Sequence, residues 1–293
     1  MKTSTLHTPL VLPVIRWRFV LSMTALALVC SLAAVLWGHL IFQPEGNDWR
    51  GAYRPAALAV LAGQSPYTIS AFFNPPWILL PMLPLALLPE RVGLAIIQAA
   101  SLIGYGYAAR RLGAKWPVLI LFLFTPQTLW DANMGNIDWL IALGFVLPPQ
   151  AGLFLVLLKP QIGAGVALFW LVEAWRRGGV REAVRVFTPV SFAFILSFLL
   201  YGPYLLHFGD AVGKSWNLAA AVWPLLLPVG AVLIYGALRE RSQGKAILSA
   251  VFLSPYVAAP SLAVAVLGLL PAQAPAIIAI LGLWLVWLLR GPM

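Results

Sequence analysis

Long apolar runs alternate with short polar segments along this chain, and few of the polar segments exceed a handful of residues. A run of about 20 apolar residues is typical of a membrane-spanning helix. The pattern therefore predicts an all-α polytopic membrane protein, a bundle of about ten transmembrane segments. The apolar runs are 19–42, 77–88, 92–109, 116–130, 139–158, 162–175, 187–206, 219–238, 246–270 and 274–289.

No internal repeat, low-complexity tract or long linker interrupts this series of runs. We therefore expect a single helical membrane domain over 1–293. It would begin with a first span, 19–42, continue through an outer loop, 43–76, and hold the remaining spans in 77–290.

Composition narrows the class of protein. The chain is 61% hydrophobic and only 10% charged, with a mean hydropathy of +0.90, which is too little charge for a soluble domain of this length. The formal net charge of +10 comes from short basic clusters between apolar runs. Such clusters are typical of loops at an anionic cytoplasmic leaflet, so we expect a membrane lipid partner and no nucleic acid.

The positive-inside tendency orients the chain. Basic residues before the first span predict a cytoplasmic N-terminus, and the clusters at 176–185 and 239–245 are expected on the same side. Arg290 then predicts a cytoplasmic C-terminus. The expected location is the plasma membrane, with 43–76 outside.

Two arrangements of the spans satisfy these charges. In the first, 77–88 and 92–109 are separate spans, 139–158 is one span, and the polar segment 131–138 faces inside. In the second, the proline-rich 77–109 crosses once, 139–158 is a broken pair, and 131–138 faces outside. Both arrangements place Lys159 on the outer face.

The outer loop has its own pattern. Residues 54–63 are small and aliphatic, with Pro55 near the start and Gly63 at the end, which predicts a short helix. Because it is too short to cross the bilayer, we expect it to lie along the interface. Prolines at 66, 75 and 76 then break the helix before the chain returns to lipid.

Asp48 is the first candidate for chemistry, because an acid just outside a span beside Arg50 could be a general base held ionised by nearby positive charge. A solvated loop acid or a helix cap is the alternative. Arg50, Arg54 and Lys159 are cations on the outer side, where guanidinium and ammonium groups would suit a lipid phosphate. For Lys159 a structural ion pair is an equally good interpretation.

Other polar residues are candidate lining of a water-filled cavity. Asp131, Asn136 and Asp138 lie between two apolar runs, where they would line such a cavity or cap the adjoining helices. Tyr53 and His207 complete this set, although an interfacial turn also explains His207. Three scattered histidines and one cysteine provide no metal-binding spacing, so we expect no metal and no cofactor.

The order of several short motifs resembles a known family. From the first loop onward the chain carries Asp48-Trp49, Tyr53, Ala56-Ala57, Leu61-Ala62-Gly63, Pro66-Tyr67, Asn74-Pro75-Pro76, Pro84 to Pro89, Gly135-Asn136, Ala151-Gly152-Leu153 and Lys159-Pro160 before an arginine cluster. This order resembles the polyprenol-phosphate-mannose-dependent mannosyltransferases, glycosyltransferase family 87 of the GT-C superfamily.

The resemblance implies a GT-C fold with an active site on the outer face. It implies inverting transfer of a hexose, mannose-like, from a polyprenyl-phosphate sugar donor to a hydroxyl of a glycolipid or cell-envelope glycan acceptor. Asp48 falls on the position of the catalytic acid. The alternatives are a non-catalytic membrane subunit of a larger assembly and a transporter of lipids or small molecules.

Overall fold

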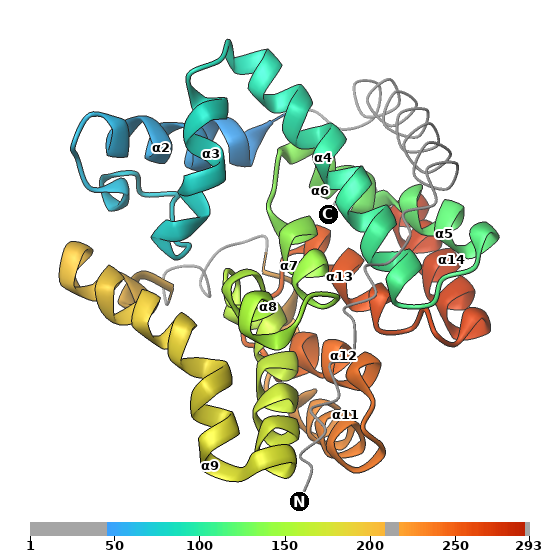
Figure 1. Cartoon of the computed structure of the whole chain (residues 1–293). Coiled ribbons are helices and arrows are strands. Elements are labelled where there is room, and N and C mark those ends of the chain that lie inside the picture. Colours follow the sequence, from blue (N-terminus) through green and yellow to red (C-terminus); the bar gives the residue numbers. More distant parts are fainter. Residues whose placement is uncertain (1–45, 209–216, 291–293) are drawn as a thin grey trace, which may run out of the picture.

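The structure is a computed structural model that describes residues 46–208 and 217–290 of the chain. Within these ranges it is helical and contains no strand, as the sequence predicts. The expected first span, 19–42, lies outside the described residues. In chain order the elements are η1 (Trp49–Tyr53), α2 (Arg54–Leu61), η2 (Pro66–Thr68), η3 (Pro76–Ile78), α3 (Leu79–Ala86), α4 (Glu90–Arg111), α5 (Trp116–Leu123), α6 (Pro126–Met134), α7 (Asp138–Gly144), α8 (Pro149–Val156), α9 (Pro160–Tyr201), η4 (Tyr204–Phe208), η5 (Leu218–Ala221), α11 (Leu227–Glu240), α12 (Gln243–Leu253), η6 (Ala259–Ser261), α13 (Leu262–Leu267) and α14 (Gln273–Arg290) (Figure 1).

Three of the described helices are long and apolar enough to cross a membrane. They are α4 with 22 residues, α9 with 42 and α14 with 18. The segment Pro76–Ala86 and helix α12 are apolar but shorter. The described residues therefore form an all-helical fold with three helices of membrane-spanning length, and several of the other apolar runs are divided into shorter helices.

Prolines cause much of this division. The run 116–130, expected as one span, is instead α5 and α6, because Pro126 begins α6 and Thr125 caps it by accepting a hydrogen bond from the Thr128 amide. The run 139–158 is the broken pair α7 and α8, as the second arrangement predicts. By contrast, α3 and α4 are separate helices. The first arrangement predicts two separate spans here, and of the two only α4 is long enough to cross a membrane.

Helix α9 contains 162–175 and most of the run 187–206, up to Tyr201, and bends sharply between them. The corner is at Gly178 and Gly179, whose backbone is not helical; Gly179 has φ 61° and ψ −150°, a conformation in which a side chain would be strained. Figure 1 shows two straight legs that meet there. The first leg, from Pro160 to this corner, rises about 27 Å, which is close to the thickness of a bilayer core.

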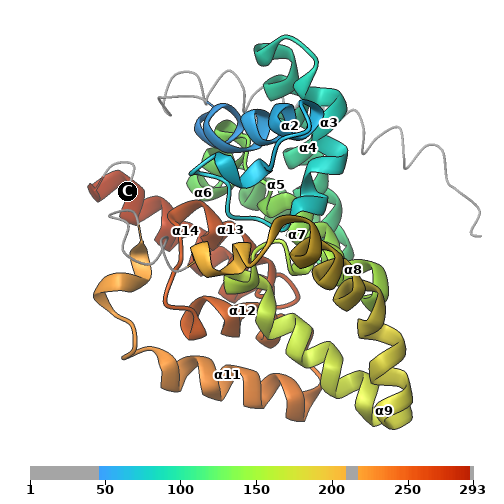
Figure 2. The ribbon, with the colours of Figure 1, turned by 90° about the vertical axis from the view of Figure 1, so that its left-hand side faces the viewer.

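The two basic clusters lie together at this corner. Arg176 donates a hydrogen bond to the carbonyl oxygen of Leu238 at 2.6 Å, and the Arg241 Nε lies 3.9 Å from Glu173. Figure 2 shows α11 running beneath α12 toward the corner of α9. The structure thus gathers the positive charges of 176–185 and 239–245 on one face, which is the grouping that the sequence predicts.

The outer loop lies at the far end of α9. Tyr67 stacks on Tyr204 with ring centroids 4.6 Å apart and meets Tyr201 edge to face at 5.8 Å. The loop contains α2, which follows η1 and confirms the short helix predicted for 54–63. The loop and the basic corner therefore occupy opposite ends of the second leg of α9.

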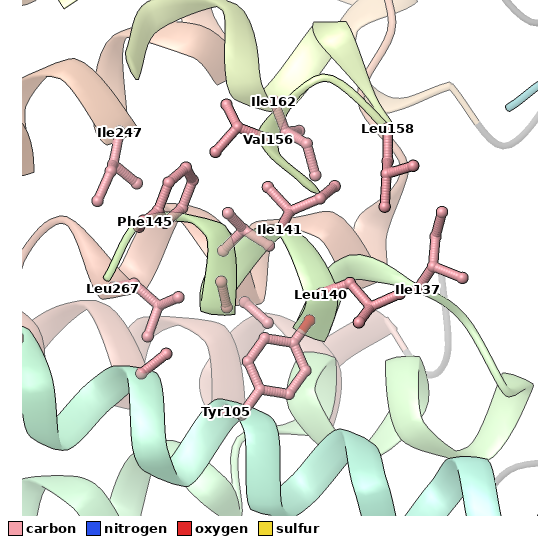
Figure 3. Packing of buried hydrophobic residues seen from close by; sticks show 14 of the residues in the cluster. Tyr105, Ile137, Leu140, Ile141, Phe145, Val156, Leu158, Ile162, Ile247 and Leu267 are labelled. Atoms are coloured by element: carbon pink, nitrogen blue, oxygen red, sulfur yellow. The ribbon is translucent and has the colours of Figure 1, made fainter. Parts of the chain in front are cut away.

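The hydrophobic core surrounds α7. This short helix packs against α4, α8 and α13, and Ile137, Ile141 and Phe145 are each almost fully buried. Figure 3 shows these side chains among Val156, Ile162 and Leu267 from neighbouring elements. Burying α7 on all sides fixes the place of the polar residues at its N-terminal end.

Cysteine labelling tests which faces lie outside and inside. The background is Cys30→Ser, which removes the only cysteine of the chain. In intact cells a membrane-impermeant maleimide should label Gln64→Cys, an exposed loop position, but should label Val180→Cys at the basic corner only after permeabilisation. The reverse pattern, or equal labelling of both positions, would contradict this orientation.

Candidate functional site

A tight turn between α6 and α7 supports the site. Helix α6 ends at Met134, and the next residue, Gly135, caps it in the left-handed conformation with φ 67° and ψ 37°. A Cβ atom on Gly135 would lie 2.8 Å from the Cβ of Trp49, so glycine is needed for space as well as for the turn. The amide of Gly46 donates to the carbonyl oxygen of Asn133 at 2.9 Å. These contacts hold the start of the outer loop against 131–138.

A buried ion pair follows this turn. Asp138 is the first residue of α7 and has no exposed surface, and Lys159 immediately precedes α9. The Lys159 Nζ lies 2.6 Å from Asp138 Oδ1 and donates to Asn136 Oδ1 at 2.7 Å. Ser261 donates to the other carboxylate oxygen, Oδ2, at 2.6 Å. The polar segment 131–138 and Lys159 therefore lie on the same face.

A cavity of about 1100 Å³ opens next to this ion pair. Its lining includes the polar side chains of Asp48, Tyr53 and Lys159 and apolar side chains such as Leu168 and Leu253. These residues come from segments far apart in the sequence: Asp48 and Tyr53 from the start of the loop, Lys159 and Leu168 from the start of α9, and Leu253 from the end of α12. The site thus combines charged groups with a surface that suits a hydrocarbon chain.

Asp48 is the titratable group whose surroundings best suit a general base. Within the described part of the chain its carboxylate has no hydrogen bond or ion pair, and it lines the cavity. Burial raises the pKa of Asp48 from 3.8 to about 6; the charge of Lys159 opposes this rise and that of Asp138 adds to it. A carboxylate with a pKa near 6 is a better base than an ordinary aspartate and is still ionised at neutral pH.

The structure brings four of the predicted site residues to the cavity: Asp48, Tyr53, Asn136 and Lys159. The Tyr53 hydroxyl donates to Asn136 Oδ1 at a long 3.5 Å. Asp138 lies behind them and reaches the cavity through its contact with Lys159. Tyr53, Asn136, Lys159 and Asp138 thus form one connected group, and Asp48 lines the same cavity.

The other predicted residues lie elsewhere. Arg50 and Arg54 both approach Glu90, at 2.8 and 4.0 Å, and do not line the cavity. Asp131 is buried in α6 and accepts a hydrogen bond from the Tyr105 hydroxyl at 2.9 Å. His207 falls in η4, and its side chain lies outside the described part of the chain.

Sequence reasoning did not find two residues that organise the site. Ser261 contacts Asp138, and the Asn74 side chain donates to the carbonyl oxygen of Leu158 at 2.9 Å, which joins the outer loop to the residue before Lys159. The signal for Ser261 was the Pro260-Ser261 break inside the apolar run 246–270. Asn74 was visible only as part of an Asn-Pro-Pro turn.

Comparisons with known proteins give no relative for this arrangement: no protein-family model, curated protein or solved structure matches the chain. The interpretation of the site therefore depends on its own residues.

Replacing Gly135 tests the turn that supports the site. Gly135→Ala should lower the melting temperature of the purified protein, because alanine is strained at φ 67° and its Cβ would overlap Trp49. Gly63→Ala is the matched control, since Gly63 has φ 72° but no atom within 4 Å of an added Cβ. We expect Gly135→Ala to lower the free energy of unfolding by about 1–3 kcal/mol more than Gly63→Ala does. Equal decreases in the two variants would contradict the close packing of Gly135 on Trp49.

Proposed function

We propose that this chain is an integral membrane glycosyltransferase of the GT-C type. It would transfer a hexose, mannose-like, from a polyprenyl-phosphate sugar donor to an acceptor hydroxyl of a glycolipid or cell-envelope glycan. The observation that carries this proposal is Asp48, a carboxylate of raised pKa that has no hydrogen bond or ion pair among the described residues. It lines, together with Lys159, a cavity that also has apolar lining. The resemblance to glycosyltransferase family 87 adds the type of donor.

The position of the cavity supports an outer-face reaction. Lys159 is at the start of the first leg of α9, and the basic corner is about 27 Å away at its end. If the basic corner lies in the cytoplasm, as charged loops of this kind do, the cavity opens at the outer face. A donor with a lipid tail would then reach the cavity from the bilayer.

Asp48 would act as the general base. The carboxylate removes the proton from the acceptor hydroxyl as the hydroxyl oxygen forms a bond to the anomeric carbon of the donor. The bond from that carbon to the phosphate oxygen breaks, and its electron pair leaves with the phosphate. Attack from the side opposite the phosphate inverts the anomeric configuration. With a pKa of about 6, Asp48 is about nine-tenths ionised at pH 7.

Lys159 is the best supported holder of the donor phosphate. An ammonium group has three N–H donors; Asn136 accepts a hydrogen bond from it, and Asp138 is its ion-pair partner. An N–H that is not bonded to Asn136 is available to a phosphate oxygen in the cavity. The ion pairs of Arg50 and Arg54 with Glu90 place these arginines away from the cavity wall, so they support this role less well.

The complete ten-segment bundle belongs to this proposal. It needs 19–42 as its first span and the interfacial position of α2, and both stay predictions. The cytoplasmic side of Arg290 is a prediction too, because it follows from the charge distribution alone. The other end of α14 lies beside Gly113, close in sequence to Arg110 and Arg111, and the same charge rule would place these two arginines in the cytoplasm and Arg290 on the opposite side. A C-terminal reporter fusion would decide between the two sides.

A transporter is the second candidate, because α7 and α8 are a broken helix pair with a buried ion pair at one end. Secondary transporters place binding sites at such breaks. The two proposals differ at Asp48, which only the transferase needs as a base.

Asp48→Asn tests the transferase directly. Removing the base should lower the rate constant for sugar transfer by about 10²–10⁴-fold, measured with purified protein and a polyprenyl-phosphate sugar. Asn47→Ala, a neighbour on the same cavity wall, is the control and should keep most of the activity. Full activity of Asp48→Asn with an unchanged melting temperature would contradict the proposal.

The pH dependence gives a separate test. Transfer should increase as pH rises through about 6 and level off near 7, because the ionised Asp48 is the reactive form. Stability should change in the opposite direction: the folded pKa lies above the unfolded 3.8, so the contribution of Asp48 to stability is present below pH 4 and lost as pH rises through about 6. Asp48→Asn should remove this part of the pH dependence of the melting temperature. A flat activity profile between pH 5 and 7 would exclude Asp48 as the base.

A further inference from the structure

Three segments far apart in the sequence meet at the carboxylate of Asp138. Asp138 begins α7, Lys159 precedes α9, and Ser261 ends η6 immediately before α13. The carboxylate uses one oxygen for each partner: Oδ1 lies 2.6 Å from Lys159 Nζ, and Oδ2 accepts from Ser261 Oγ at 2.6 Å. Asp138 is fully buried, and Ser261 is 3% exposed.

The two contacts of Asp138 depend on each other. The last torsion of an aspartate side chain has a broad energy profile, so the carboxylate plane is set by its partners rather than by the side chain itself. A hydroxyl fixed on Oδ2 therefore fixes the direction of Oδ1. Because Oδ1 holds the ammonium group of Lys159, Ser261 controls the position of that group without being bonded to it.

Asn136 supplies the second fixed point for the ammonium group. Its Oδ1 accepts from Lys159 Nζ at 2.7 Å and from the backbone amide of Ile137 at 2.6 Å. The amide side chain is thus held by the turn that precedes α7. With Asn136 as acceptor and Asp138 as ion-pair partner, the ammonium group keeps an N–H for the cavity that Lys159 lines.

We infer that Ser261 is a positioning residue for Lys159: by orienting Asp138, it directs an N–H of the ammonium group toward a phosphate oxygen of a ligand in the cavity. This inference rests on the proposed function, because it assumes that Lys159 binds the phosphate of the donor. It assigns a specific role to η6, an element more than a hundred residues from the first loop in sequence.

Kinetics of Ser261→Ala test the inference. Loss of the hydroxyl leaves Asp138 Oδ2 without its donor, and we expect KM for the polyprenyl-phosphate sugar to rise by about 10-fold, with a smaller change in kcat. Ser261→Thr keeps the hydroxyl and should restore KM. Unchanged KM in Ser261→Ala would overturn the inference. If Ser261→Ala does not fold, Ser261→Cys, which offers only a weak donor, takes its place.

Ser261 also lines the cavity, so a direct contact with the substrate has to be distinguished from an action through Lys159. A double-mutant cycle does this. If Ser261 acts through Lys159, Ser261→Ala should have no further effect on KM in a Lys159→Met background. Effects of the two substitutions that multiply would show a direct contact and overturn the positioning role.

A binding measurement separates this inference from the proposed function. Dodecyl phosphate should raise the melting temperature of the unaltered protein and of Ser261→Thr, but raise that of Ser261→Ala and Lys159→Met much less; dodecanol is the uncharged control. If the unaltered protein transfers no sugar, the proposed function fails, yet this pattern would still support the positioning role. Equal stabilisation of all four proteins by dodecyl phosphate would overturn it.

Discussion

The ion pair between Lys159 and Asp138 is the interaction on which the arrangement of this protein depends. Two charges removed from water cost several kcal/mol each unless hydrogen bonds satisfy them, and here Asn136 and Ser261 supply those bonds. Because the partners come from the starts of α7 and α9 and from η6, the requirement to satisfy the pair also fixes these elements relative to one another. The apolar core around α7 keeps Asp138 fully buried, while Lys159 lines the cavity.

The aspartate of this pair, Asp138, and the nearby Asp48 have opposite surroundings. Asp138 has a partner on each oxygen, so its charge is compensated and serves the structure. Asp48 has no such partner among the described residues, faces the cavity, and has a pKa raised to about 6 by burial. Carboxylates whose environments differ in this way are typical of sites that need one fixed charge and one proton acceptor. The proposed transferase assigns these two tasks to Asp138 and Asp48.

The outer loop is held at the site by contacts with the turns between helices. Trp49 donates from its indole to the carbonyl oxygen of Glu90 and packs on Gly135, while Asn74 binds the carbonyl oxygen of Leu158. Because the loop is attached near both its start and its end, the position of Asp48 is fixed. The breaks in the helices on either side are therefore part of the site, since unbroken spans would leave no turn for the loop to contact.

The sequence by itself determined the helical class, the short helix within 54–63, the grouping of the basic clusters and the common face of Asp48 and Lys159. Each of these follows from local signals: apolar length, proline and glycine positions, and the sign of charge between runs. Only the tertiary structure decided that Arg50 turns to Glu90 rather than to the cavity and that Ser261 completes the ion pair. These contacts depend on which side chains from distant segments lie close enough to a charged group to pair with it. The spacing of residues along the chain does not determine which distant segments meet.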